Sequence, residues 1–293
     1  MVRHFLVVLF MGVTAGLWAQ TASQGINRPL RTQRPDPSTP TPDPILNYSL
    51  ITNNYSLLTP DALDQPLTQY YIARYSNPSG ILWLNSVIKN GNVFLPYIKK
   101  EIERRGLPPE LAYLPFIESG YIGTARSKSG AVGLWQFMLN SIPPSVKVNE
   151  MIDERRDFRK STAAALTKLE ENYRTLGNWP LALAAYNAGL GAVSRAVQRA
   201  KTSDYWLLCE KKEFKTETIH YVPKLLAVSY MLSRSRQFNL DYWPETMDWT
   251  VIKPGRQASL DLIASETGTD RNVLHRLNLE LLHGITPADK NYE

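Results

Sequence analysis

Hydrophobic side chains recur at helical spacing through much of the chain, and one charged residue interrupts the pattern. In residues 107–120, prolines precede an apolar run in which Leu111, Leu114 and Glu118 fall at i, i+3 and i+7 on one face of a predicted helix. A carboxylate is therefore predicted at an inward-facing position. The alternative is that Glu118 stands near the C-terminus of the helix and already leans into solvent, which is the usual placement of a glutamate.

An inward-facing Glu118 would be suited to acid catalysis. A carboxyl group held against apolar side chains is poorly solvated, which disfavours its charged form and can raise its pKa from ~4.3 toward ~6–7. A carboxyl with such a pKa can donate a proton at neutral pH. The position of Glu118 therefore predicts a general acid.

The same periodicity predicts helices on both sides of this segment. Helical pieces extend from about residue 67 to residue 105, with turn signals at 77–80 and 90–92, and the last piece, 93–105, ends at Gly106. We interpret these pieces as a helical lead-in that packs on the segment containing Glu118.

Two longer helices are expected further along the chain. One is amphipathic over residues 166–176, with Ser161 or Thr162 as its N-cap and Gly177 as its stop. The next covers about residues 180–199, and its small side chains would allow close helix packing around a cleft.

The pattern changes only near the C-terminus. No strand-rich region precedes residue 249, so the expected fold class is mainly α. Residues 249–255 predict a strand and a turn, and two short helical patterns follow at 260–265 and 272–277. This order resembles a LysM module, a small βααβ unit that binds N-acetylglucosamine chains, although Leu279 replaces the usual proline and the chain stops where the closing strand is expected. A helical appendage that only packs on the rest of the chain is the alternative.

The N-terminal residues predict export. Arg3 and His4 precede an apolar run over residues 5–17, and residues 1–19 are interpreted as a signal peptide because this run is too short to span a membrane. An uncleaved anchor is the alternative. Residues 20–47 form a Pro- and Thr-rich linker. A lipoprotein anchor would need a cysteine after the apolar run, but the only cysteine is Cys209, so no membrane attachment is expected after signal removal.

Charge and motif content exclude several other functions. The 33 basic and 27 acidic residues give a mild, scattered excess of +6, and no nucleic-acid motif is present, so no nucleic-acid partner is expected. No residues stand at metal-ligand intervals, and no metal or cofactor is predicted. Ser86 and Lys89 match a penicillin-binding pattern without its companion motifs. Cys209 could pair with His220 as a nucleophile but lacks the surroundings of a thiol protease.

A loop rich in small residues follows Glu118. Residues 125–138 (ARSKSGAVGLWQFM) place glycines, which allow close approach of a ligand, beside aromatic, amide and thioether groups that suit a sugar. With this segment the chain closely resembles the soluble lytic transglycosylase (goose-lysozyme-like) family, in particular its membrane-bound murein transglycosylase D type. The match continues through DERRD at 153–157, STAAA at 161–165, WPLALAAYNAG at 179–189 and ETIHYVPK at 217–224.

The resemblance implies a lysozyme-like domain that acts on peptidoglycan glycan strands in the periplasm or cell envelope of a bacterium. It implies that Glu118 cleaves the β-1,4 bond between N-acetylmuramic acid and N-acetylglucosamine, first as acid and then as base, with help from the substrate's N-acetyl group. The products would carry 1,6-anhydromuramoyl ends. Carried over by position, the substrate-binding residues are Ser127, Gln136, Met138, Tyr186, Asn187, Glu217 and Tyr221. For the two tyrosines, a place in the core is the alternative.

The predicted organisation is a signal peptide (1–19), a linker (20–47), a helical lead-in (48–106), a lytic transglycosylase catalytic domain (107–245) and a LysM-like βαα(β) segment (246–293). Two other functions stay open. One is a lysozyme-like hydrolase on the same fold, for which Asp153, Glu154 or Asp157 could supply the second carboxylate that glycosidases normally use, although ion-pairing or capping roles suit these residues better. The other is a non-catalytic peptidoglycan-binding protein, against which the intact Glu118 argues.

Overall fold

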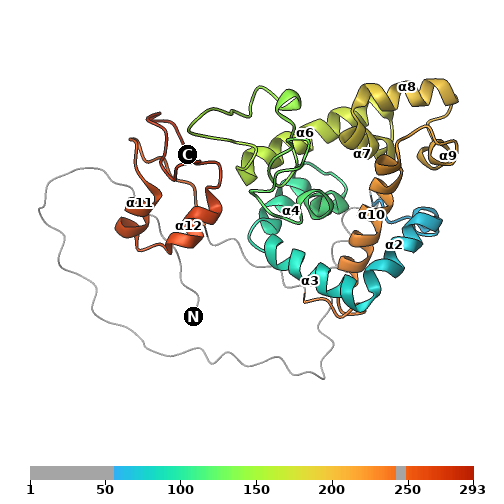
Figure 1. The fold of residues 1–293 in the computed structure, drawn as a ribbon, viewed down its shortest axis with the longest axis horizontal. Coiled ribbons are helices and arrows are strands. Elements are labelled where there is room, and N and C mark those ends of the chain that lie inside the picture. Colours follow the sequence, from blue (N-terminus) through green and yellow to red (C-terminus); the bar gives the residue numbers. More distant parts are fainter. Residues whose placement is uncertain (1–55, 242–248) are drawn as a thin grey trace, which may run out of the picture.

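The computed structural model describes residues 56–241 and 249–293, and this part of the chain is mainly helical (Figure 1). The predicted signal peptide, the linker and the first residues of the lead-in lie outside the described residues. In chain order the elements are α1 (Pro60–Leu63), α2 (Pro66–Ser76), α3 (Pro78–Gly91), α4 (Leu95–Arg104), the 3-10 helix η2 (Pro109–Tyr113), α5 (Leu114–Ser119), the 3-10 helix η3 (Leu139–Ser141), α6 (Phe158–Leu176), α7 (Trp179–Ala188), α8 (Leu190–Ala200), α9 (Tyr205–Glu210), α10 (Thr216–Ser233), α11 (Leu260–Thr267) and α12 (Arg271–Leu277).

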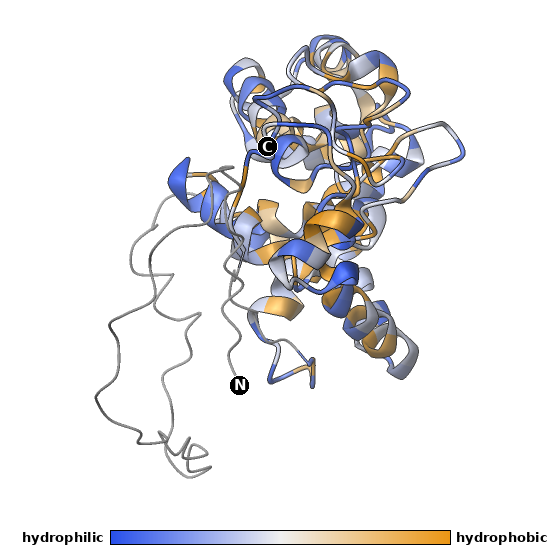
Figure 2. Ribbon diagram, turned by 90° about the vertical axis from the view of Figure 1, so that its left-hand side faces the viewer, coloured by the Kyte–Doolittle hydropathy of each residue, from blue (hydrophilic) through white to orange (hydrophobic). Residues whose placement is uncertain are grey.

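Helix α10 is the central element of the fold. It contacts α2, α7, α5 and η2, and its side chains are buried on nearly all sides, as expected for a helix that is apolar around its circumference. Leu225, Val228 and Met231 are fully buried. In Figure 2 the hydrophobic segments gather where helices meet. The N-terminal turns of α10, which carry Glu217 and Tyr221, are thereby fixed against the element that carries Glu118.

The lead-in has the predicted helices. The turn signals at 77–80 and 90–92 fall at the two ends of α3, and the side chain of Asn77 caps α3 by accepting a hydrogen bond from the backbone N–H of Gly80 at 2.8 Å. These helices contribute Leu84, Ile98 and Ile102 to the core.

The predicted N-cap of the helix over 166–176 was wrong. Helix α6 begins at Phe158, and its cap is Asp157, whose Oδ1 accepts from the backbone N–H groups of Arg159 and Lys160 at 2.8 and 3.1 Å. Ser161 and Thr162 are buried one turn inside the helix. Thr162 is used instead to accept a hydrogen bond from the indole N–H of Trp135 at 2.9 Å, a contact that local sequence does not reveal.

The single helix predicted over 180–199 is divided into two. Helix α7 ends at Ala188 and α8 begins at Leu190, because Gly189 has φ of 88° and ψ of 137°, a conformation that non-glycine residues rarely adopt. The small residues of α7 do allow close packing, since Ala184 and Ala185 are fully buried against the neighbouring helices.

The strand predicted at 249–255 is not formed. Among the described residues, 249–255 belong to no strand or helix. The C-terminal segment contains α11 and α12, an antiparallel bridge between Ser259 and Ile285, and a second bridge from Leu281 to Ile152 outside the segment. The structure therefore does not support the βααβ order of a LysM module. The two helical patterns themselves were predicted correctly as α11 and α12.

The C-terminal segment packs on the loop that precedes α6. The backbone N–H of Asp153 donates to Glu280 O at 2.9 Å, and that of Leu282 donates to Met151 O at 3.0 Å. Ile152 is buried together with Leu281 and other residues of the segment. These contacts agree with the alternative of a packed appendage.

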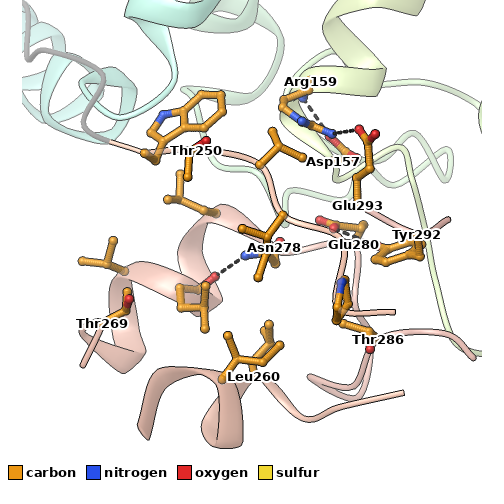
Figure 3. A pocket seen from close by; sticks show the side chains of 18 of the residues that line it. Asp157, Arg159, Thr250, Leu260, Thr269, Asn278, Glu280, Thr286, Tyr292 and Glu293 are labelled. Carbon is orange, nitrogen blue, oxygen red and sulfur yellow. Dashed lines mark hydrogen bonds and ion pairs between the residues drawn. The ribbon is translucent and has the colours of Figure 1, made fainter. Parts of the chain in front are cut away.

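A cavity of about 120 Å³ lies at this junction (Figure 3). Its apolar wall includes Trp249, Leu260 and Leu274, and its polar end includes Asp157 and Glu280. Tyr292 donates a hydrogen bond to Glu280 Oε1 at 3.0 Å, while Glu280 Oε2 is buried without a partner in the described part of the chain. Burial, followed by the negative charge of Asp157, raises the pKa of Glu280 to about 7.

Candidate active site

Glu118 stands at the end of a short helix. The continuous helix predicted over residues 107–120 is broken into η2 and α5, so that Leu111 and Leu114 are fully buried while Glu118, the penultimate residue of α5, is partly exposed. Both interpretations of the pattern were thus partly correct. The side chain lies among core residues, yet its position near the helix end leaves it accessible.

Tyr221 is the hydrogen-bond partner of Glu118. Its hydroxyl donates to Glu118 Oε1 across 103 residues of sequence. Tyr221 is itself buried, and its pKa is raised well above the ordinary value by burial and then by the nearby charge of Glu118. At any pH near neutrality the tyrosine is therefore protonated and can donate a hydrogen bond to the carboxylate of Glu118.

The pKa of Glu118 is raised to about 7. The main cause is burial, which disfavours the charged form. The hydrogen bond from Tyr221 lowers the pKa in part, the negative charge of Glu217 raises it, and the positive charge of Lys168 lowers it. A carboxyl in this environment exchanges its proton near neutral pH, as both a general acid and a general base require.

The loop after Glu118 folds back on itself and contacts the helix that carries the acid. Val132 forms antiparallel bridges with Arg126 and Phe137, and the hydroxyl of Ser119 donates to Leu134 O at 2.9 Å. Gly133 allows the segment that carries Arg155 to approach the loop closely, because a Cβ at position 133 would lie 1.9 Å from Arg155 O. The loop is therefore held in one place relative to Glu118.

Gln136 and Tyr186 both bond to the backbone of this loop. Gln136 has a positive φ of 50°, and its amide donates to Gly133 O at 2.9 Å. The Tyr186 hydroxyl donates to Trp135 O at 2.8 Å. Tyr186 is buried, as the core alternative expected, but the charge of Glu118 contributes to its raised pKa, so the ring also lies close to the acid.

Ser127 and Met138 lie at the two ends of the loop. The hydroxyl oxygen of Ser127 accepts from the backbone N–H of Ala131 at 3.0 Å, and its own O–H has no acceptor among residues 56–241 and 249–293, so it can donate to a ligand. Ser127 and Met138 are both partly exposed.

Asn187 and Glu217 lie on α7 and α10 and contact each other rather than Glu118. The amide of Asn187 donates to Glu217 Oε1 at 3.4 Å, and its oxygen accepts from the hydroxyl of Thr218 at 2.8 Å. Glu217 is exposed and influences Glu118 through its charge. Glu217 and Tyr221 lie on one helix at i and i+4, so α10 presents an exposed acid beside the buried partner of Glu118.

Lys168 also lies near Glu118, and it was not among the site residues predicted from the sequence. Its Nζ lies 5.0 Å from the ring centroid of Tyr186 and 5.8 Å from that of Phe137. Burial lowers the pKa of Lys168, and the charge of Glu118 raises it in part. Lys168 follows the buried Ala164 and Ala165 by four and three residues, so a charge on the inner face of a predicted helix was the available signal.

The acids of the 153–157 motif have structural roles. Asp153 forms an ion pair with Arg155 at 2.8 Å, and the guanidinium of Arg155 also donates to Phe137 O at 3.4 Å, which braces the loop. Glu154 binds Lys160 at 2.6 Å, and Asp157 caps α6. The ion-pairing and capping roles expected for these acids are thus present in the structure.

The competing nucleophiles are not assembled. Burial raises the pKa of Cys209 to about 11, and His220 contacts the hydroxyl of Tyr71 at 3.0 Å instead of the thiol. Ser86 donates to Trp83 O on the exposed side of α3. Within residues 56–241 and 249–293, no cluster of three histidine, cysteine or acidic side chains has the arrangement of a metal site, and no helix is sufficiently long and apolar to cross a bilayer.

Comparisons with known proteins agree with this geometry. Residues 96–209 match the family model described as "Transglycosylase SLT domain", so the chain contains such a domain, and the match includes Glu118 and its loop. Over 168 residues, 54% of this chain, it is 34% identical to "Membrane-bound lytic murein transglycosylase D" from Escherichia coli strain K12 and equally to the protein of that name from E. coli O6:H1.

A third relative comes from Alteromonas sp. (strain M-1) and is named for tributyltin chloride resistance. The chain is 37% identical to it over 139 residues, which are 46% of this chain and 66% of that protein. The aligned region is only 35% of the length of the two E. coli proteins. The likeness therefore concerns the transglycosylase region and not the whole of those relatives.

Proposed function

We propose that this protein is a lytic transglycosylase that cleaves the β-1,4 bond between N-acetylmuramic acid and N-acetylglucosamine in peptidoglycan and leaves 1,6-anhydromuramoyl ends. The observation that carries the proposal is the environment of Glu118. Its carboxyl is partly buried, has a pKa of about 7 and accepts a hydrogen bond from Tyr221. The transglycosylase SLT match over residues 96–209 supports the same reaction.

The proposed reaction needs one carboxyl group with two successive roles. Protonated Glu118 donates its proton to the glycosidic oxygen as the bond to the anomeric carbon breaks, and the substrate's N-acetyl oxygen stabilises the positive charge that develops there. The carboxylate of Glu118 then accepts the proton of the C6 hydroxyl while that oxygen bonds to the anomeric carbon. No water is consumed, and Glu118 ends the cycle protonated. A pKa near 7 suits both steps, because neither form of the carboxyl is strongly disfavoured at neutral pH.

The other residues would bind and position the sugar. Tyr221 holds Glu118 in place and stabilises its carboxylate between the two steps. Ser127 would donate its free O–H to the N-acetyl group, and Gln136 and Met138 would line the sugar subsites. Asn187 and Glu217 would form a polar subsite wall at the start of α10, and Tyr186 would support the loop from beneath.

A lysozyme-like hydrolase would need a base to activate water. Asp153, Glu154 and Asp157 are occupied by ion pairs or capping hydrogen bonds, and Glu217 is the exposed carboxylate whose charge reaches Glu118. Hydrolysis by Glu118 and Glu217 is the second candidate function, and a non-catalytic peptidoglycan-binding protein is the third. The resemblance to an envelope transglycosylase leads us to propose export and action in the bacterial envelope.

Mass spectrometry of digested sacculi tests the proposal. Purified protein should release muropeptides that are one water lighter than hydrolytic products, and Glu118→Gln should abolish release, because an amide keeps the shape but cannot donate the proton; loss of a general acid typically costs ~10²–10⁴-fold. Glu217→Gln is the matched control, since it removes an exposed carboxylate from the same site. Products that contain the added water, and that are lost in both the Glu118→Gln and the Glu217→Gln variant, would show that the reaction is hydrolysis. Full activity of the Glu118→Gln variant would remove Glu118 from its role.

A further inference from the structure

Lys168 places a positive charge on an aromatic wall beside Glu118. The rings of Phe137 and Tyr186, whose centroids are 6.3 Å apart, come from the loop and from α7, and the Lys168 ammonium lies 5.8 and 5.0 Å from them. Lys168 is close enough to Glu118 for each charge to affect the pKa of the other. The loop that carries Phe137 is also tied to α5 by the hydrogen bond from the Ser119 hydroxyl to Leu134 O, so the ammonium lies at the same site as the proposed acid.

This ammonium has no anionic partner of its own. In the part of the chain that the structure describes, Lys168 forms no ion pair and no hydrogen bond, and its contacts are the two ring faces. Removing an ammonium group from water costs free energy unless an opposite charge or hydrogen bonds compensate for it. Lys160, on the same helix, follows that rule by binding Glu154 at 2.6 Å. The three N–H donors of Lys168 are thus available to an oxygen of a bound ligand.

The reacting sugar offers one group that can match this charge. The hydroxyl and N-acetyl oxygens of the glycan are neutral, whereas the lactyl ether of N-acetylmuramic acid ends in a carboxyl group on the same ring as the reacting carbon. That carboxyl is an amide when a stem peptide is attached and an anion when the peptide is absent. Charge-assisted hydrogen bonds are about twice as strong as neutral ones, so the anion is the better partner.

We propose that Lys168 binds the free lactyl carboxylate of N-acetylmuramic acid, so that this site favours glycan strands from which the stem peptides have been removed. The inference rests on the proposed cleavage at muramic acid. It also accounts for a cation in a site where positive charge develops on the anomeric carbon. A carboxylate paired with Lys168 offsets the repulsion between these two charges, whereas a neutral amide leaves that repulsion in place.

The test compares three purified glycan substrates. The first consists of strands freed of stem peptides by an amidase, the second is the same material with its lactyl carboxyl groups converted to carboxamides, and the third retains its stems. The carboxamide has the size of the carboxylate without its charge, so it separates charge recognition from the bulk of the peptide. Release of anhydro products is measured for the wild type, Lys168→Met and Lys168→Arg, and melting curves verify that each variant is folded.

The wild type should have a kcat/KM roughly ten-fold or more higher for the carboxylate strands than for the carboxamide strands. Lys168→Arg should retain most of this preference because it keeps the charge, whereas Lys168→Met should lose it and still cleave both substrates. Equal rates of the wild type on both substrates would overturn the inference without any variant. A Lys168→Met variant that keeps the preference, including one that slows both substrates by the same factor, would also overturn it. Absence of anhydro products from every substrate would instead count against the proposed function.

Discussion

Replacing Tyr221 with phenylalanine should raise the pKa of Glu118 above its present value. The Tyr221 hydroxyl donates to Glu118 Oε1, and a donor at this position stabilises the carboxylate more than the neutral acid. Tyr221→Phe removes only this hydroxyl from a ring that is 6% exposed, so the core packing stays filled. The charged form of Glu118 loses its donor, and the proton is held more tightly.

The size of the change follows from the kind of hydrogen bond that is lost. A hydrogen bond to a charged group contributes about 1.5–3 kcal/mol, and 1.36 kcal/mol corresponds to one pH unit in pKa. The protonated carboxyl can keep part of this bond, and Glu118 is partly exposed to solvent, so only the lower end of the range applies. We therefore expect the pKa of Glu118 to rise by about one pH unit.

The assay is the pH dependence of kcat/KM for release of anhydro products, together with NMR titration of the Glu118 carboxyl carbon. Since the first step needs protonated Glu118, the alkaline limb of the profile should move upward by the same amount as the pKa. Tyr186→Phe is the matched control, because its hydroxyl is equally buried but donates to Trp135 O. An unchanged or lowered pKa in Tyr221→Phe, or an equal rise in Tyr186→Phe, would refute the reasoning.

Three further predictions concern the loop, the buried carboxyl at the junction and the C-terminal segment. Ser127→Ala should slow turnover modestly, because one hydrogen bond contributes about 0.5–1.5 kcal/mol, and wild-type rates on intact glycan would show that the loop hydroxyl serves packing alone. Burial raises the folded-state pKa of Glu280 to about 7, so its contribution to stability is full below the unfolded pKa near 4.5 and is lost as the pH rises toward 7. Glu280→Gln should therefore melt at a higher temperature than the wild type at pH 8 and lose this advantage at pH 4; an advantage that does not change with pH would contradict this linkage. Deleting residues 249–293 should lower the melting temperature, because it exposes Ile152 and removes the hydrogen bonds at Asp153 and Met151, while cleavage of short soluble glycan fragments is retained. An unchanged melting temperature with weaker binding to sacculi would instead favour the glycan-binding interpretation of this segment.

The sequence by itself determined the helices of the lead-in, the two helices of the C-terminal segment and the identity of the proposed acid. Helical spacing depends on residues three and four positions apart, so α2, α3, α4, α11 and α12 could be predicted from local pattern. Glu118 was found because a charged side chain falls in an apolar series, and this signal is equally local.

Other features depended on competition between local signals and distant partners. Ser161 and Thr162 are residue types that often cap helices, but Asp157 caps α6. The hydroxyl of Thr162 instead accepts a hydrogen bond from Trp135, which is distant in sequence. Residues 249–255 have the composition of a strand, yet a strand needs a neighbour to bond with, and none is present among the described residues. Propensity suggests what a segment can form, and tertiary contacts decide between the possibilities.

The environment of Glu118 was decided only by the tertiary structure. Its hydrogen-bond partner Tyr221 lies 103 residues away in the sequence, and Lys168, whose charge lowers its pKa, belongs to a third element, α6. No local pattern specifies these contacts, because they result from the packing of α5, α6, α7 and α10. The pKa of about 7 is likewise a property of the folded chain, since desolvation exists only after the core has closed around the carboxyl group.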